Sequence, residues 1–376
     1  MPSLRTAPVR PQPVGSSSAK VLLGLLASVP DPRRPRGVRH SLPGLLAVAL
    51  AAVVCGARSF AAIGQWVGDV DADLFTALGF RRGRRPSESA IRRAFGRLDA
   101  AKLDAVLGAW MWTRTTVVDQ QRVIAIDGKT IRGARTHDST APHLVAAFDH
   151  GHGVVLGQLA IAAKSNEIPA VRTLLATFDL AGVVVTVDAM HTQTDTAQLI
   201  TEAGGDYVFT VKGNQPKLYA ACKALPWRDV PSRRATSKGH GRRSTRTIKV
   251  VTAPAWVEFA GAVQVAQVRR TVTRKGKKTV EVVYLITSAD TRAASPTTLA
   301  AWVQGHWSIE NRLHWVRDVT FDEDRSQVRT GAGPHVMATL RNLAIGLLRS
   351  DGWTNIAHAL RHHAADSRRP LALITT

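Results

Sequence analysis

The sequence predicts an α/β protein with an all-helical N-terminal domain, and three observations support this prediction. Apolar residues recur at helical spacing from Val21 to about Val118, between turns rich in proline and arginine. From Val123 the pattern changes to short β-branched runs that alternate with helical segments, which is typical of a mixed sheet covered by helices. A strongly basic stretch over residues 228–278 then contains further runs with strand character.

The N-terminal part is expected to contain a short disordered segment and then helices. The first 19 residues are rich in Pro, Ser and Arg and lack the apolar core of a signal peptide, so we expect a disordered basic N-terminus. Residues 20–118 form the predicted helical domain. Its apolar run from Leu42 to Ala57 is shorter than the ~18 to 20 residues that a membrane span needs, which favours a buried helix. Ser87 or Ser89 is placed to cap a later helix.

Residues 119–227 are predicted to form the first part of the α/β core. Strands are expected in "VIAIDGK", "HLVAAFD", "GVVLGQLAIAA", "GVVVTVDA" and "YVFTVKGN", with helices near 168–178 and 192–203. Residues 228–294 are predicted to be a basic β-rich insertion, because 14 Lys or Arg stand against two acids between 228 and 278. Strands near 263–273 and 279–287 would flank a turn at Gly276. Helices over 295–350 would complete the core, followed by a C-terminal tail over 351–376.

The charge of the chain predicts a polyanionic partner. Its 50 Lys and Arg residues exceed its 28 Asp and Glu residues, which gives a net charge of +22 and a sequence pI of about 11.2. Arginine dominates the excess, and its planar fork suits phosphate, so nucleic acid is favoured over a basic surface kept for solubility. Cys55 and Cys222 have no spacing that would build a zinc site or a disulfide framework, which fits a reducing cytosol.

Two aspartates are candidate metal ligands because each follows an apolar run that is predicted to be a strand. Asp127 and Asp188 would then meet at one edge of the sheet, where side chains face a cleft. Hard divalent cations such as Mg²⁺ prefer carboxylates and phosphate oxygens. The alternative for each aspartate is a turn-forming residue after a strand.

A third acid is expected from a helix that packs on the same sheet. Helical spacing of four, four and three residues places one acid on a face with three basic side chains: His306, Glu310, His314 and Arg317. We therefore favour Glu310 over the acids further along the chain, which are Asp318, Asp322, Glu323 and Asp324. The alternative is an exposed, ion-paired helix face.

Long, ordered motifs resemble those of a known family. "AIDGKTIRGA", "KSNEIPA", "TVDAMHTQ", "DYVFTVKGNQPKL" and "GHWSIENRLHWVRDVTFDEDRSQVRTG" are similar to the ISAs1 family of insertion-sequence transposases, which includes the H-repeat-associated proteins and belongs to the IS4-like DDE group. "DPRRPRGVRHSL", "GARSFAAIGQW" and "PSESAIRRAFGRLD" resemble the helical domain that accompanies this catalytic domain. The resemblance covers about Val21 to Arg349.

The resemblance implies an RNase H-like catalytic core with a β-rich insertion between the second Asp and the Glu. Asp127, Asp188 and Glu310 would bind two Mg²⁺ or Mn²⁺ ions and catalyse DNA cleavage at element ends and strand transfer into target DNA. The implied partner is double-stranded DNA, both terminal inverted repeats and target, bound by a homodimer in a synaptic complex without a membrane. The setting would be a bacterial cytoplasm, at the nucleoid. Alternatives are an RNase H-like nuclease without strand transfer and a domesticated or inactive DNA-binding derivative.

Further basic residues are candidate DNA contacts. Lys129 and Lys212 follow predicted strand ends. Seven arginines lie between 81 and 97, and of these Arg93 and Arg97 share a helix face and are candidates. The basic insertion adds Arg242, Arg243 and Arg246. The helix of Glu310 adds His306, His314 and Arg317. The wider group has Tyr, Arg and Lys around its glutamate where this chain has Val303, His306 and Arg317. Members of the family tend to have an acid where this chain has Ser244. Trp302 and Trp315 are expected in the core, whereas Trp307 would face the DNA. His191 is expected to be structural.

Overall fold

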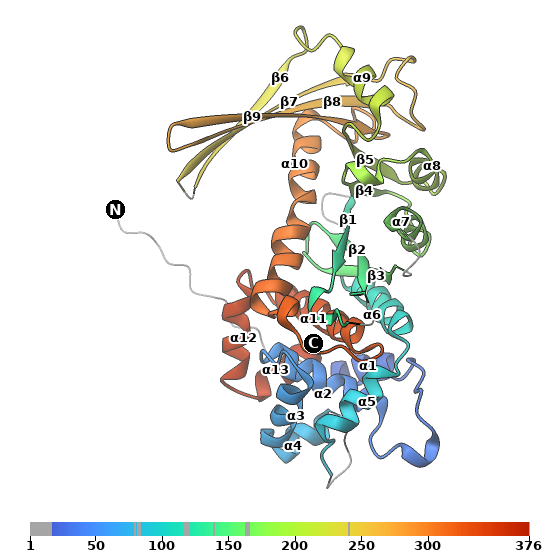
Figure 1. Cartoon of the computed structure of the whole chain (residues 1–376), viewed down its shortest axis with the longest axis vertical. Helices are drawn as coiled ribbons and strands as arrows, with labels where there is room; N and C mark the ends of the chain where they lie inside the picture. Colours follow the sequence, from blue (N-terminus) through green and yellow to red (C-terminus); the bar gives the residue numbers. More distant parts are fainter. Residues whose placement is uncertain are drawn as a thin grey trace.

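The computed structural model places helices at one end of an elongated molecule and a long β-ribbon at the other (Figure 1). It describes residues 17–78, 80, 84–115, 121–137, 140–161, 166–239 and 241–375. Residues 1–16, most of the segment predicted to be disordered, lie outside the described residues, and so do Arg81 and Arg82 of the arginine cluster.

Six helices precede the sheet, as the helical pattern predicts. They are α1 (Ser17–Leu26), α2 (Leu42–Val54), α3 (Phe60–Asp69), α4 (Ala72–Ala77), α5 (Glu88–Gly96) and α6 (Ala100–Arg114), with a 3₁₀ turn, η1 (Pro35–Gly37), before α2. The Ser87 hydroxyl accepts a hydrogen bond from the Ala90 N–H at the start of α5, which confirms the predicted cap. Helix α2 is buried on almost every side, as expected for its apolar run. None of the described helices combines the length and apolar character that a bilayer crossing requires.

A single nine-stranded sheet forms the α/β part, in the order β3-β2-β1-β4-β5-β9-β8-β7-β6. Its strands are β1 (Arg122–Thr130), β2 (His143–Asp149), β3 (Val155–Ala160), β4 (Val183–Val187), β5 (Asp206–Val211), β6 (Ser232–Gly239), β7 (Arg242–Thr252), β8 (Gln264–Arg274) and β9 (Lys277–Thr287). Strands β1, β4 and β5 are parallel to one another, and every other neighbouring pair is antiparallel. The predicted mixed α/β architecture with helices before it is therefore confirmed.

Helices cover both faces of the central strands. Helices α7 (Glu167–Leu175) and α8 (Thr194–Glu202) pack in the main core with Val183, Val185 and Val187 of β4. On the opposite face, α10 (Pro296–His306) packs with Val184 and with residues of β5, β7, β8 and β9. Helix α9 (Pro216–Ala224) lies beside the ribbon. Because β4 is buried on both faces, its sequence is a continuous run of apolar and β-branched residues.

The basic insertion extends the core sheet and does not form a sheet of its own. The predicted hairpin is present as β8 and β9, with Gly276 at φ 76° in its turn. Strand β9 also pairs with β5 through Val208 and Thr287, which joins the ribbon to the core. Strands β6 and β7 were not anticipated, because β6 is fully exposed and has no apolar alternation to reveal it.

The helix after α10 differs from a regular α-helix in the region that carries Glu310. Two π-helical segments follow, η4 (Glu310–His314) and η5 (Val316–Thr320), and short 3₁₀ turns occur as η2 (Arg132–Ala134), η3 (Ala189–His191) and η6 (Glu323–Arg325). Such i→i+5 turns are rare and often lie at functional sites.

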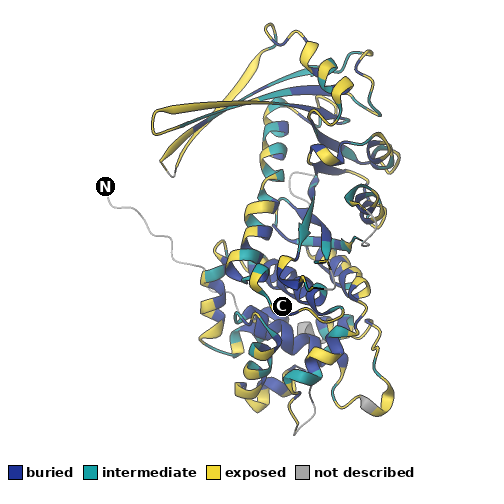
Figure 2. Ribbon diagram, viewed as in Figure 1, coloured by how far each residue is buried: buried dark blue, intermediate teal, exposed yellow. Residues whose placement is uncertain are grey.

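The C-terminal residues expected to form a tail contain two helices. They are α12 (Ile356–Ala364) and α13 (Arg368–Thr375), and they follow the long helix α11 (Gly333–Ser350), which is buried along most of its length. Helix α13 contacts α1 and α2, and α11 contacts α2 and α6 (Figure 1). Figure 2 shows the resulting dark core at this end and the exposed ribbon at the other. Sequence pattern missed this arrangement because most contacts of α13 are with α1 and α2, helices at the opposite end of the chain.

Candidate active site

Two neighbouring parallel strands position the two aspartates. Asp127 lies within β1 and not at its end, because β1 continues along β2 to Thr130, but it is one residue past the last β1–β4 pair, Ile126 with Val187. Asp188 directly follows β4. Its Oδ1 accepts hydrogen bonds from the N–H groups of Met190 at 3.0 Å and His191 at 3.4 Å, which caps η3.

Glu310 reaches the same place from the π-helical segment. His314 Nδ1 lies 3.2 Å from Glu310 Oε2 and 3.5 Å from Asp127 Oδ2, so the imidazole stands between the two carboxylates. One ligand atom from each of these three residues falls within 4.8 Å of the others. Asp188 lines a cavity of about 200 Å³ together with Asp127 and Glu310. The fold therefore brings the three predicted acids into one cavity.

The surroundings of Asp127 and Glu310 shift their pKa values in opposite directions. Burial raises the pKa of Asp127, as do the negative charges of Asp188 and Glu310, although His314 and the Gly128 N–H oppose this. The hydrogen bond from His314 lowers the pKa of Glu310 despite partial burial. A divalent cation would offset the negative charges that raise the pKa of Asp127, and carboxylate oxygens are donors that Mg²⁺ or Mn²⁺ prefers. This donor set fits a hard metal ion.

Another group of side chains contacts the segments next to the two aspartates. Glu167 Oε2 lies 3.0 Å from His191 Nε2, and Glu167 Oε1 lies 2.7 Å from His143 Nε2. His143 Nδ1 is 2.7 Å from the Thr130 hydroxyl in β1. The hydrogen bond from His191 lowers the pKa of Glu167. His191 is buried and structural, as expected, whereas Glu167 and His143 were missed, although Glu167 belongs to the motif "KSNEIPA".

Three of the basic residues predicted near the acids have defined surroundings in the structure. Lys212 lines the acid cavity, but Lys129 Nζ forms an ion pair with Asp318 Oδ1 at 2.6 Å. His306 also lines the cavity, where its Nδ1 lies 3.1 Å from the Thr186 hydroxyl. Burial lowers the pKa of His306 to about 4, so this side chain is neutral at neutral pH. Any contact of His306 with DNA would therefore be a hydrogen bond from a neutral ring.

The prediction that Arg317 binds DNA is wrong. Its side chain is 1% exposed and forms an ion pair with the fully buried Glu323, with Arg317 Nη2 2.7 Å from Glu323 Oε1. The spacing argument assumed α-helical turns, in which seven residues make about two turns. The π-helical segments have more residues per turn, so Arg317 faces away from Glu310. His314 is 4% exposed and contacts Glu310 and Asp127, so it is placed to hold the acids and not to meet an incoming strand.

The other predicted DNA contacts lie on exposed elements. Arg93 and Arg97 are exposed at α5. In β7, Arg242 and Arg246 share a sheet face with Ile248, which packs against α10 on the side of the acids, whereas Arg243 lies on the other face. Arg246 is directly opposite Arg270.

Two details of the ribbon and of the Glu310 helix complete the comparison with the sequence. Ser244 is buried between the arginine rows, and its Oγ has no hydrogen-bond partner among the described residues. Trp302 is buried and Trp307 is 63% exposed, as expected, but Trp315 is 55% exposed and not in the core.

Comparison with known proteins gives consistent matches. Residues 119–347 match the family described as transposase DDE domain, and residues 23–111 match the family described as DDE_Tnp_1-associated. Putative protein YbfL of Escherichia coli (strain K12) is 34% identical over 349 residues, which cover 88% of this chain and 91% of the relative. The H repeat-associated putative transposase YhhI of the same strain is 33% identical, with the same coverage.

Among solved structures, the cryo-EM structure of the piggyBac transposase synaptic complex with hairpin DNA has a TM-score of 0.44 and 13% identity, covering 95% of this chain and 80% of that chain. This similarity is too low to support a functional argument. The family matches and the two Escherichia coli relatives, which extend over most of the chain, decide the assignment: this protein belongs to the transposase DDE-domain family.

Proposed function

We propose that this protein catalyses metal-dependent DNA cleavage at the ends of an insertion sequence and transfers the resulting strand into target DNA. The observation that carries the proposal is the meeting of Asp127, Asp188 and Glu310 in one cavity. The strand order β3-β2-β1-β4-β5, with β2 antiparallel to β1, supports an RNase H-like core. The family membership supports DNA transposition as the overall process.

The proposed chemistry assigns a role to each side chain of the cavity. Asp127, Asp188 and Glu310 would hold two divalent ions, which when bound would activate the attacking hydroxyl and stabilise the leaving oxygen. His314 keeps Asp127 and Glu310 in position through its Nδ1. Lys212, at the cavity wall, would attract the phosphate of the scissile strand. Glu167 holds His191 and His143 and so stabilises the backbone next to both aspartates.

The path of the DNA is proposed from the charge of the sheet. Arg242 and Arg246 project from the sheet face that also carries the acids, and the row opposite them adds Arg270 and Arg274. A duplex placed against this face would meet a row of cations before it reaches the cavity. Arg93 and Arg97 would contact another part of the element end, and a homodimer at the nucleoid would pair two ends.

The test uses the DNA that flanks the gene on each side as labelled duplexes, with a target plasmid and Mg²⁺ or Mn²⁺. We expect cleavage and joined products from the wild type and neither from Asp188→Asn, in which the amide oxygen still caps η3. Asp229→Asn, at an exposed acid outside the cavity, is the matched control and should remain active. Cleavage without joining would indicate a nuclease, and binding without either reaction would indicate an inactive derivative; both results contradict the proposal.

A further inference from the structure

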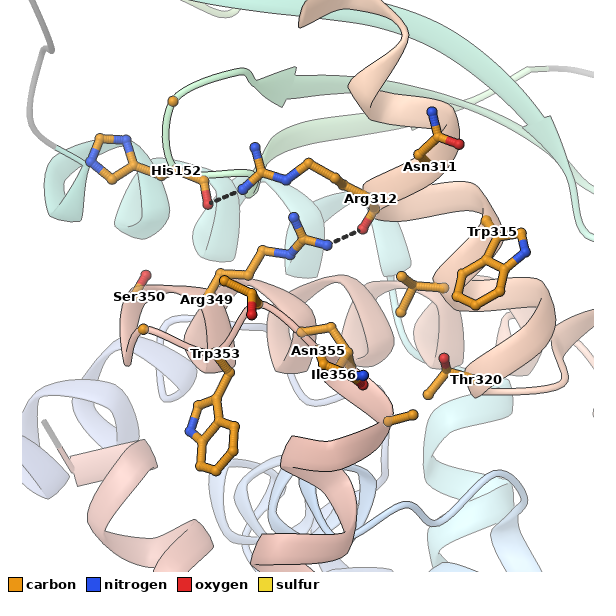
Figure 3. A pocket seen from close by; sticks show the side chains of 15 residues that line it. His152, Asn311, Arg312, Trp315, Thr320, Arg349, Ser350, Trp353, Asn355 and Ile356 are labelled. Carbon is orange, nitrogen blue, oxygen red and sulfur yellow. Dashed lines mark hydrogen bonds between the residues drawn. The ribbon is translucent and has the colours of Figure 1, made fainter. Parts of the chain in front are cut away.

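A second and larger cavity lies on the other side of the helix that carries Glu310. Its volume is about 720 Å³, within the range of small-molecule sites. It is bounded by the turn between β2 and β3, the π-helical segments, and the connection from α11 to α12 (Figure 3). None of its described lining residues also lines the acid cavity. It is therefore a separate site.

Two arginines converge in this cavity without a carboxylate between them. Arg312 Nη1 donates to the His150 carbonyl at 2.9 Å. Arg312 Nη2 donates to the His152 carbonyl at 3.4 Å, and Arg349 Nη2 donates to the Arg312 carbonyl at 2.6 Å (Figure 3). Within the described part of the chain neither forms an ion pair with an acid. Asp149 acts on Arg312 only through its more distant charge. The Nε of Arg349 is buried and lacks a partner among the described residues.

Glycine 153 makes this convergence possible. Its φ of 73° lies in the left-handed region, and a Cβ there would collide with the guanidinium groups of both Arg312 and Arg349. Burial and the charge of Arg312 lower the pKa of Arg349 to about 10, which is still well above neutral pH. The two adjacent cations are hydrogen-bonded to carbonyl groups and not to a carboxylate, so an anion in this cavity would be stabilised by both.

The rest of the cavity wall adds an aromatic surface and helix amides. Trp315 is 55% exposed at its edge, although an indole in the core was predicted. Ile356 and Ala357, the first residues of the nine-residue helix α12, also line the cavity. The N-terminus of a helix favours a negative charge through its free N–H groups and its dipole. A phosphate on the arginines and a flat base on the indole would use both features.

We propose that this cavity binds one nucleotide of an unpaired DNA strand, with its phosphate on Arg312 and Arg349 and its base stacked on Trp315. The proposal rests on the proposed action on DNA, and the strand must be unpaired because bases inside a duplex cannot reach an indole. Arg312 is two residues from Glu310 on the same helical segment. A strand held here would therefore be anchored against the helix that carries the third acid.

The base contact is tested with single strands and no divalent metal, so that cleavage cannot interfere. Fluorescence anisotropy would compare an oligothymidylate with an abasic strand of the same length. We expect wild-type protein to bind the first about 5- to 150-fold more tightly, the range of one base–aromatic stack. Trp315→Ala should reduce this ratio to about 1, whereas Trp256→Ala, at an indole with 53% exposure outside the cavity, should preserve it. An unchanged ratio in Trp315→Ala overturns the proposal.

The phosphate contact is tested by salt dependence. Arg349→Gln should lower the slope of log affinity against log salt by about 0.7, the value for one phosphate contact to a single strand. Arg361→Gln, at an exposed arginine of α12 outside the cavity, controls for the loss of one charge. If Arg349→Gln does not fold, Arg349→Lys keeps the charge and removes the planar fork, and it should still bind more weakly.

The outcomes separate this proposal from the proposed function. A wild-type protein that binds single strands through Trp315 and Arg349 but never cleaves element ends would contradict only the proposed function. Normal slopes and normal base dependence in both variants, in a protein that cleaves and joins DNA, would overturn only the nucleotide site.

Discussion

The buried carboxylate of Glu323 offers the sharpest test of how this fold is held together. Glu323 is 0% exposed and lies between Arg317 and Arg341, each 1% exposed, with Arg341 Nη1 2.8 Å from Glu323 Oε2. Burial alone would raise the pKa of Glu323, but the charges and hydrogen bonds of the two arginines together lower it from 4.5 to about 2. Glu323→Gln removes this charge and leaves two buried arginines without an anion.

The expected loss follows from this pKa difference. A lowering from 4.5 to about 2 corresponds to about 3 kcal/mol of folding free energy. Breaking a buried ion pair by removing one partner typically costs about 3 to 5 kcal/mol. The two estimates agree, so we expect Glu323→Gln to lower the free energy of unfolding by about 3 to 5 kcal/mol, or the melting temperature by about 5 °C for one cooperative unit of this size.

The pH dependence gives an independent check. Because folding lowers the pKa of Glu323, its contribution is complete above about pH 4.5 and is lost as the pH falls towards 2. Urea unfolding followed by circular dichroism should therefore show a difference between wild type and Glu323→Gln that is constant near neutral pH and shrinks below pH 4.5.

Glu310→Gln is the matched control, because it makes the same change at a side chain that is 60% exposed. It should change stability by less than about 1 kcal/mol and abolish metal-dependent cleavage. The reasoning is refuted if Glu323→Gln costs less than about 1 kcal/mol at neutral pH, or if its stability difference from wild type is the same at every pH.

Three further changes test other parts of the structure. Gly128→Ala would place a Cβ 2.6 Å from Glu167 Oε2, so we expect cleavage to fall at least about tenfold with a stability loss of about 1 to 3 kcal/mol; full activity in a folded variant would show that Glu167 does not position the site. Ser244→Glu puts a carboxylate beside Arg246, which would cancel one phosphate contact. The slope of log affinity for duplex DNA against log salt should therefore fall by about 1, and an unchanged slope would place the DNA elsewhere. In Gly108→Ala the added Cβ would overlap the backbone of β3, so the free energy of unfolding measured by denaturation should fall by about 1 to 3 kcal/mol. A variant as stable as wild type would mean that α6 can move away from the sheet.

Several features of this protein follow from local sequence alone. The apolar run of α2, the Ser87 cap and the β8–β9 hairpin with Gly276 depend on residues that are close in the chain, and all three were predicted. The three acids could be proposed because two follow β-branched runs and because long motifs surround all of them.

The tertiary structure decided which faces these residues present. Arg317 was predicted to contact DNA, but the π-helical turns carry it into the core, where it meets Glu323 and Arg341. The same change of helical geometry accompanies the exposure of Trp315 beside the Arg312 and Arg349 cavity. Helical periodicity assumes one hydrogen-bond pattern, so a local switch to i→i+5 bonding rotates every later side chain, and no count along the sequence reveals it.

The sequence by itself determined the basic charge, the helical character of the N-terminal part, the core strands β1 to β5 and the β8–β9 hairpin, and it suggested the three acids, because these depend on short-range pattern and composition. Only the tertiary structure decided that β9 joins the insertion to the core, that α13 packs on α1, and that Glu167 supports both aspartates. Each of these contacts joins residues that are distant in the chain, and its free energy arises from burial and pairing that exist only after folding.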